Sequence, residues 1–342
     1  MNKRLVELDA LRGLAALMVV GFHYTARFQK LYGHPAPLPF VMPDGFFGVK
    51  LFFMISGFVI FMTLERTRDY RDFLVSRFAR LYPAYWAAVA LTASAVTLFA
   101  LPFRGTTLST ALVNLSMLQQ WFDVPHVDGV YRTLTFELAF YAIMLALFSL
   151  RLLRRIEWVA GLWLCSMLGV YALERFTTVR LPPLVKTSLL LGCANLFVAG
   201  IMFFEVHRRE HRGAALLLIV ASLAAEFIMY GRVSGLFCTA FFALFAAVVL
   251  GMRWVCLPLS AAPLVYLGTI SYSLYLLHQY IGYVILRALY ARAYAPGVAI
   301  AITFAAVVLL AACLNTLIEI PARRAIRTFW RERRAKSGPE PA

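Results

Sequence analysis

Charged residues are scarce in this chain of 342 residues. Only 15% of the residues are Asp, Glu, Lys or Arg, whereas 62% are hydrophobic and the mean hydropathy is +0.76. A soluble globular domain carries about 25% charged residues and roughly half apolar ones. The composition therefore excludes a soluble protein and indicates an integral membrane protein.

Acidic residues are few, and no two cysteines have the spacing of a paired motif. The chain has 17 acidic residues against 33 basic ones, a net charge of +16. Its 5 cysteines each lie alone in or beside an apolar stretch, without the paired spacing of zinc or redox motifs, so no metal site is predicted.

We find no internal repeat. The basic N-terminus is followed by an apolar stretch without a small-residue cleavage site, which predicts that the first helix is retained.

Apolar stretches of about twenty residues follow one another along the whole chain, which is the length needed to cross a bilayer core of about 30 Å. They predict an all-α polytopic membrane protein with about ten transmembrane helices and both termini on one side of the membrane. The expected spans are 8–29, 46–65, 82–101, 129–150, 156–174, 187–204, 214–230, 235–252, 263–287 and 298–318.

The basic residues fall mostly in loops on one side of this predicted topology. Because an excess of Lys and Arg marks cytoplasmic loops, both termini are expected in the cytoplasm. The loops also place these charges near anionic lipid headgroups, so membrane lipids are expected partners. Nucleic acid is not an expected partner, because the basic residues alternate between loops and do not gather with aromatic side chains in one groove.

Three ionisable residues interrupt the first expected span, LDALRGLAALMVVGFHY (8–24). At about 100° per residue, Asp9, Arg12 and His23 fall within an arc of about 60° on one helix face. Arg12 and His23 are separated by about 16 Å along the helix axis. An ionisable side chain at membrane depth is costly and therefore a functional candidate. The alternative is that Asp9 and Arg12 are interfacial anchors and that His23 is a hydrogen-bonded packing residue.

Glu137 and Tyr141 form a second polar pair, because residues four apart lie on the same face of a helix. At membrane depth Glu137 needs a cationic or hydrogen-bonding partner, for which Arg12, Arg132 or His23 is available. A structural ion pair is the alternative to a functional role.

Ser271, Tyr275 and His278 are spaced four and three residues apart, so they line one face of the ninth expected span. This line is either a polar path or a hydrogen-bonding seam between helices.

Arg77 and Arg80 lie three residues apart on a predicted amphipathic helix in the most basic cytoplasmic loop. This spacing directs two guanidinium groups toward one anionic ligand such as a phosphate or diphosphate. Attraction to anionic lipid headgroups is the alternative explanation for either arginine.

Six sequence blocks together resemble the acyltransferase-3 family of membrane O-acyltransferases, which includes bacterial O-antigen and exopolysaccharide acetyltransferases. They occur in the family order. The blocks are LDALRGLAALMVVGFHY (8–24), GVKLFFMISGFVI (48–60), FLVSRFARLYPAYW (73–86), TLTFELAFY (133–141), LGTISYSLYLLH (267–278) and EIPAR (319–323). The expected organisation is an acyltransferase-3-like transmembrane domain over 1–323 and a basic, disordered cytoplasmic tail over 324–342. We expect a multi-pass protein of the bacterial inner (cytoplasmic) membrane, without a fused esterase-like domain.

The resemblance implies a reaction and a set of residues for it. An acyl group, most often acetyl, passes from cytoplasmic acyl-CoA to a hydroxyl of a glycan or lipid-linked glycan, and acyl-CoA is a co-substrate with no tightly bound cofactor. His23 matches the catalytic base and Arg12 the essential arginine of the first motif. Glu137 matches a glutamate that sets the charge of the imidazole or orients it. Arg77 and Arg80 match the pair associated with acyl-CoA binding.

Further residues of the matched motifs are expected to line the site. They are Asp9, Ser56, Tyr141, Arg132, Ser271, Tyr275 and His278. Arg132 departs from the family pattern, because many members carry tryptophan there, and a cationic contact allows an acidic acceptor. The first alternative is a transporter or flippase for a glycan or lipid, with a His, Glu and Arg relay. The second is an acyltransferase that acts on a small hydroxylated molecule such as a macrolide, or that uses succinyl-CoA or another short acyl-CoA.

Overall fold

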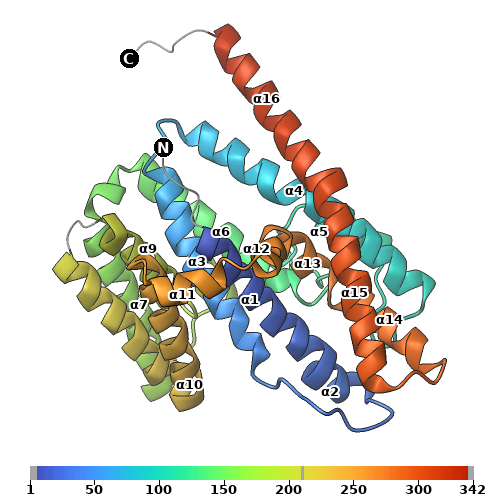
Figure 1. The fold of residues 1–342 in the computed structure, drawn as a ribbon. Coiled ribbons are helices and arrows are strands. Elements are labelled where there is room, and N and C mark those ends of the chain that lie inside the picture. The colour runs from blue at the N-terminus through green and yellow to red at the C-terminus, as the bar shows by residue number, and fades with distance from the viewer. Residues whose placement is uncertain (1–5, 209–211, 338–342) are drawn as a thin grey trace. The chain divides into compact units, whose positions relative to one another are not determined.

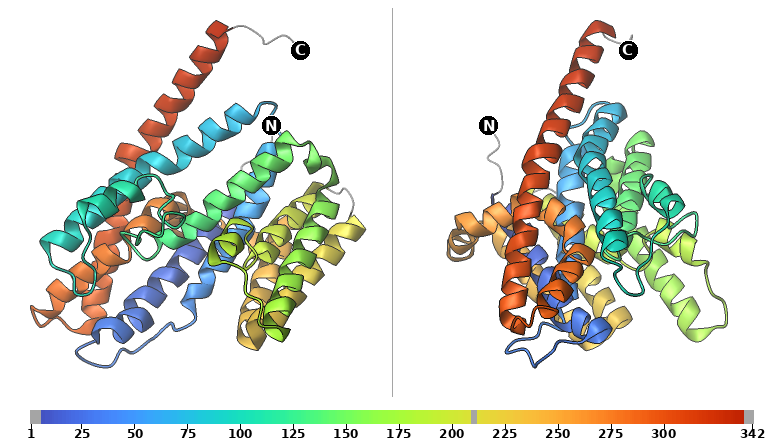
Figure 2. Two further views of the ribbon diagram at one scale, coloured as in Figure 1. Left: turned by 180° about the vertical axis from the view of Figure 1, so that it is seen from behind. Right: turned by 90° about the vertical axis from the view of Figure 1, so that its right-hand side faces the viewer.

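The computed structural model describes residues 6–208 and 212–337, and this part of the chain consists of helices and loops without a β-strand (Figures 1 and 2). The predicted all-α class is confirmed. The chain forms two compact units. The first unit holds the residues up to His23, 42–66 and 132–269, and the second holds 24–41, 67–131 and the residues from 270 onward. Residues 1–5 and 338–342, at the outer ends of the predicted domain and tail, lie outside the described residues.

Six segments of the described chain are long and apolar enough to cross a membrane. These are Gly45–Leu64, Tyr70–Leu98, Tyr131–Ser149, Leu152–Phe176, Gly213–Val249 and Pro296–Lys336. Each of them overlaps at least one of the expected spans. The chain is therefore a polytopic membrane protein, while the count of about ten spans and the cytoplasmic location of both termini stay predictions.

The first unit is built from α1, α3, α9, α10 and α12 and from the helices around them. Their bounds are α1 (Val6–Phe22), η2 (Gly45–Phe47), α3 (Gly48–Leu64), α6 (Tyr131–Ser149), η3 (Leu152–Arg155), α7 (Ile156–Phe176), α8 (Pro183–Ser188), α9 (Ala194–Arg208), α10 (Arg212–Val249), α11 (Arg253–Leu259) and α12 (Ala262–Thr269). Helix α3 packs along α9, and α1 packs along α12.

Glycine makes both of these close helix packings possible. A Cβ atom on Gly200 would overlap the backbone carbonyl of Met54, and one on Gly268 would overlap the carbonyl of Asp9. In membranes, helices approach closely where small residues face each other, because little hydrophobic driving force acts between helices surrounded by lipid. Asp9 is thereby held against α12 and is buried.

Helix α10 is interrupted at Gly231, whose φ of 77° and ψ of −175° are not helical. Only glycine adopts such a conformation readily. Ser234 Oγ donates a hydrogen bond of 2.7 Å to Glu226, eight residues earlier. Eight residues of straight helix would separate them by about 12 Å, so the chain folds back at Gly231. The expected spans 214–230 and 235–252 lie on either side of this break.

The second unit ends in a continuous helical rod, drawn in orange to red in Figure 1. The helices of this unit are α2 (Phe28–Tyr32), α4 (Tyr70–Leu98), α5 (Leu108–Asn114), α13 (Ser271–Leu277), α14 (Tyr280–Tyr290), α15 (Pro296–Leu314), η4 (Asn315–Glu319) and α16 (Ile320–Ser337). The π-helical turn η1 (His23–Arg27) joins α1 to α2. The ninth expected span is not one helix, because α12, α13 and α14 are separate elements.

The tail that was expected to be disordered is instead helical as far as Ser337. Helix α16 packs against α4, where Trp330 Nε1 donates a hydrogen bond of 2.7 Å to Asp72. Arg334 pairs with Asp72 and, at 3.3 Å, with Asp69. A polar, basic sequence is typical of disorder, but these acidic partners on α4 hold it as a helix.

Candidate active site

His23 lies where α1 gives way to the π-helical turn η1. π-Helical turns are rare and occur frequently at functional sites. The imidazole is buried, with a solvent exposure of 8%, and its Nδ1 lies 2.8 Å from the backbone carbonyl oxygen of Val19. Because a carbonyl oxygen only accepts, Nδ1 carries the proton and donates it, which assigns the lone pair of the neutral ring to Nε2.

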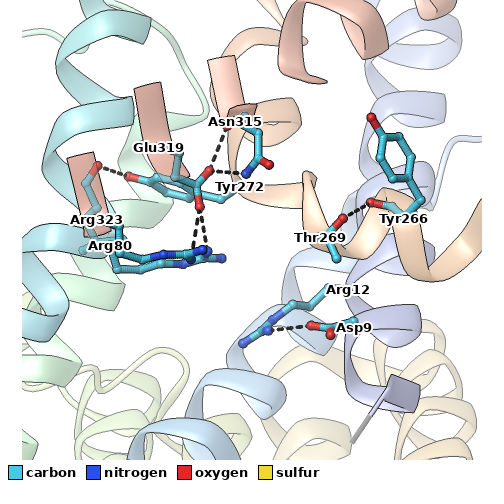
Figure 3. A network of polar contacts seen from close by, with 11 residues as sticks. Asp9, Arg12, Arg80, Tyr266, Thr269, Tyr272, Asn315, Glu319 and Arg323 are labelled. Atoms are coloured by element: carbon cyan, nitrogen blue, oxygen red, sulfur yellow. Dashed lines mark hydrogen bonds and ion pairs between the residues drawn. The ribbon is translucent and has the colours of Figure 1, made fainter. Parts of the chain in front are cut away.

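Arg12 and Asp9 form an ion pair on the same helix, with 3.2 Å between Arg12 Nη1 and Asp9 Oδ1 (Figure 3). The arginine side chain is 24% exposed and the aspartate side chain 11%. Helix α1 is uninterrupted from Val6 to Phe22, so Asp9 and Arg12, three residues apart, lie on the same face of it, as predicted. The pair places balanced charge near the start of α1.

Glu137 and Tyr141 are hydrogen-bonded on α6, with the tyrosine hydroxyl donating to the carboxylate. The predicted i, i+4 pair is therefore formed. Ser56, on α3, is half-buried, and Arg132, on the first turn of α6, is exposed. These four residues belong to the first unit, as do Asp9, Arg12 and His23.

Ser271, Tyr275 and His278 are all buried in the second unit, on α13 and its C-cap. His278 Nδ1 lies 2.8 Å from the carbonyl oxygen of Tyr275, and the two rings are 5.5 Å apart. The hydroxyl of Tyr24 donates to the His278 carbonyl at 2.8 Å. The Tyr24 bond joins η1 to the C-cap of α13, whereas the His278 bond lies within one helical turn.

Arg77 and Arg80, also in the second unit, have different partners. Arg80 Nη1 lies 2.6 Å from Glu319 Oε1, and the Glu319 side chain is only 1% exposed (Figure 3). Arg77 donates a hydrogen bond of 3.2 Å to Ser76. The two arginines of the predicted pair thus differ, because one of them is engaged by a buried carboxylate from the EIPAR block.

Sequence reasoning missed Glu319 as a site residue, although its block was part of the family resemblance. The carboxylate also accepts hydrogen bonds from Ser273 Oγ at 3.0 Å and from Asn315 Nδ2 at 2.9 Å. Among the described residues, no group of three or more His, Cys, Asp or Glu side chains is arranged to hold a metal ion.

Asp128 is a second buried carboxylate that sequence reasoning missed. It lies in the loop before α6 and accepts hydrogen bonds from the backbone N–H groups of Val130, at 3.2 Å, and Tyr280, at 3.0 Å. Burial raises the pKa of Asp128 to about 7, against the opposing effects of these N–H donors and of the Arg104 charge. The carboxylate therefore links Val130, just before α6, to Tyr280, the first residue of α14. Both residues belong to the second unit.

We expect the stability of the protein to decrease between about pH 4 and pH 7 because of Asp128. An acid whose pKa is higher in the folded than in the unfolded chain contributes stability at low pH, and this contribution is lost as the pH rises through the folded value, here about 7. At about 1.4 kcal/mol per pKa unit, the pH-dependent part is at most about 4 kcal/mol. Thermal unfolding of Asp128→Asn should lack this component. Asp123→Asn, at an exposed position of the same loop, should keep the original profile.

Lys50 and Glu226 form a buried ion pair in the first unit that sequence reasoning also missed. The Glu226 side chain is completely buried, and Asn195 Nδ2 donates to it at 2.8 Å. Lys50 Nζ also lies 2.6 Å from Ser234 Oγ and 4.5 Å from the ring centre of Tyr230. Both residues are isolated charges in apolar stretches of the sequence, so the argument that made His23 a functional candidate applies to them as well.

Taken together, the long apolar helices and the buried polar residues define a polytopic membrane protein with ionisable groups in its interior. A family model described as an acyltransferase domain matches residues 5–316, and the chain belongs to this acyltransferase-3 family. It is therefore a membrane acyltransferase, as the six sequence blocks predicted.

Three curated relatives are similar to the chain, and two of them are named as acyltransferases. "Acyltransferase MdmB" of Streptomyces mycarofaciens is 27% identical over 383 aligned positions, which cover 99% of this chain and 96% of that protein. "Putative peptidoglycan O-acetyltransferase YrhL" of Bacillus subtilis (strain 168) is 30% identical over 125 positions, 35% of this chain and 18% of that protein. "Protein 2 in picA locus" of Rhizobium radiobacter is 38% identical over 97 positions, 27% of this chain and 46% of that protein. No solved structure matches the chain.

Proposed function

We propose that this protein transfers an acetyl or other short acyl group from acyl-CoA to a hydroxyl group of a glycan, with His23 as the general base. The observation that carries the proposal is the hydrogen bond from His23 Nδ1 to the Val19 carbonyl, 2.8 Å long. It fixes the ring and leaves Nε2 as its basic atom. A neutral imidazole is suited to remove a proton near pH 7.

The proposed reaction conserves protons. Nε2 of His23 takes the proton of the acceptor hydroxyl as the oxygen attacks the thioester carbonyl carbon. A C–O bond forms, the C–S bond breaks, and the imidazolium returns the proton to the leaving CoA thiolate. Glu137, hydrogen-bonded by Tyr141, supplies negative charge in the same unit, and positive charge from Arg12 favours the oxyanion or thiolate that develops.

The choice of acceptor rests on the name of one relative. The Bacillus relative is named as a putative peptidoglycan O-acetyltransferase, and this supports a glycan hydroxyl. The full-length Streptomyces relative is named only as an acyltransferase. We therefore place the glycan first and test a small hydroxylated acceptor beside it.

The proposal is tested with purified protein reconstituted in lipid nanodiscs. Acetyl-CoA is supplied with peptidoglycan fragments, with an exopolysaccharide or with a macrolide, and succinyl-CoA replaces acetyl-CoA in a parallel series. We expect release of free CoA thiol that depends on one acceptor, and mass spectrometry of that acceptor should show one added acyl ester. A transporter or flippase would give neither product. Absence of both CoA release and ester from every pair would contradict the proposed function.

A further inference from the structure

A basic cluster joins the start of α4 to the C-terminal helix α16 in the second unit. Ser76 Oγ accepts two hydrogen bonds, one from Arg77 Nη2 at 3.2 Å and one from Arg327 Nη2 at 2.9 Å. The two arginines are 250 residues apart in sequence and are brought together by the packing of α16 on α4. Two guanidinium groups therefore converge on one neutral oxygen atom.

The neighbouring arginines differ from Arg327 in having acidic partners. Arg80 and, at 3.9 Å, Arg323 lie beside Glu319, and Arg334 pairs with Asp72. Across the described residues, the structure gives Arg327 a hydrogen bond to Ser76 but no ion pair. Four further arginines lie close enough to repel its charge. They are Arg323, Arg77, Arg331 and Arg80.

Like charges this close repel one another where no acidic side chain offsets them, and Arg327 makes no ion pair with the described residues, so binding of an anion beside it would relieve this repulsion. Guanidinium groups bind phosphate through paired N–H donors, which a single lysine does not provide. An anionic oxygen is also a stronger acceptor than the serine hydroxyl that Arg77 and Arg327 now share. The cluster thus has the charge and the donors of a phosphate site. A phosphate oxygen in place of the serine hydroxyl would accept hydrogen bonds from both guanidinium groups.

We propose that Arg77 and Arg327 form a phosphate-binding site for the nucleotide end of the acyl-CoA donor, and that Arg80 is a positioning residue. This inference rests on the proposed function for the identity of the donor. It assigns different roles to the two arginines of the family motif and adds a ligand group from the C-terminal helix. Arg80 acts through Glu319, which holds the junction of η4 and α16 against α4.

The first test is the affinity for CoA of protein in nanodiscs of neutral phosphatidylcholine, measured by isothermal titration calorimetry. Loss of a hydrogen bond to a charged group corresponds to about a tenfold to hundredfold weaker binding, which we expect for Arg327→Ala. Arg327→Lys keeps the charge but not the forked donors and should be intermediate. Lys336→Ala removes one positive charge from the exposed end of the same helix and should change the affinity by less than about twofold. Pantetheine, which lacks phosphate, should bind all three variants as it binds the original protein.

The second test separates positioning from ligand contact at Arg80. Arg80→Met alone would leave Glu319 buried without its main partner and is expected to impair folding. Arg80→Met/Glu319→Gln removes both charges and keeps an amide that bonds Asn315 and Ser273. This double variant should fold and bind CoA within about threefold of the original protein. A loss of CoA affinity as large as that of Arg327→Ala, in a folded double variant, would overturn the positioning role.

The outcomes distinguish this inference from the proposed function. If the original protein binds CoA and Arg327→Ala binds it equally well, the phosphate site is wrong and the acyl-CoA donor stands. If the original protein does not bind CoA, the donor is wrong; binding of phosphatidic acid vesicles through Arg327 would then identify a lipid headgroup as the ligand of the phosphate site, and binding of inorganic pyrophosphate alone a free phosphate. If none of these probes binds, both proposals are overturned.

Discussion

Replacement of His23 by glutamine should reduce the rate of acyl transfer by about 10²- to 10⁴-fold, the usual contribution of a positioned general base. The glutamine amide can still donate a hydrogen bond to the Val19 carbonyl, which His23 now does at 2.8 Å. It has no basic nitrogen, so the acceptor hydroxyl would have to lose its proton to water. The measurement is acceptor-dependent release of CoA thiol at saturating donor, with the CoA affinity determined separately.

A matched histidine variant controls for the effect of the substitution itself. His207 is exposed at the end of α9 in the same unit, and His207→Gln should retain full turnover. CoA affinity should be unchanged in His23→Gln, because the proposed nucleotide contacts are made by arginines elsewhere. Turnover of His23→Gln within about threefold of the original protein would remove His23 from the reaction.

The features that sequence analysis predicted are those set by local periodicity. The face shared by Asp9 and Arg12, and the pair of Glu137 with Tyr141, depend only on the turn of one helix. The apolar spans likewise depend on the length and composition of single segments. These relations hold whatever the rest of the chain does, and the structure contains the two pairs as hydrogen-bonded contacts.

The features that were missed depend on partners far away in sequence. Arg80 looks like one half of a ligand-binding pair until Glu319, 239 residues away, is placed beside it. Helix α16 has the composition of a disordered tail, and its contacts with α4, such as those of Trp330 and Arg334 with Asp72, explain why it is ordered. No periodic pattern encodes such pairings, because they arise from the packing of separate helices. The low frequency of charge in the apolar stretches was nevertheless a usable signal, since each isolated ionisable residue there needs a partner.

Lys50 and Glu226 illustrate this need, and their removal should give the largest effect on stability. We expect Lys50→Met or Glu226→Gln to lower the free energy of unfolding by about 3–5 kcal/mol, because each leaves the opposite charge buried and uncompensated. The double variant Lys50→Met/Glu226→Gln should be much closer to the original protein. Its amide retains a hydrogen-bonding group for Asn195 and Ser234, which now donate to the carboxylate at 2.8 and 2.7 Å.

The effects of the two substitutions are predicted to be coupled. A double-mutant cycle with Lys50→Met, Glu226→Gln and their combination measures this coupling. Thermal unfolding in the same detergent gives the midpoints, and the combined change should be far smaller than the sum of the single changes. The pair of Lys186 and Glu174 is a suitable control, because their side chains are 36% and 21% exposed and solvent screens their charges. Additive single effects at Lys50 and Glu226 would mean that their charges are solvated separately. Strong coupling would mean that this ion pair joins α3 to the chain reversal at Gly231, since Lys50 reaches both Glu226 before the break and Ser234 after it.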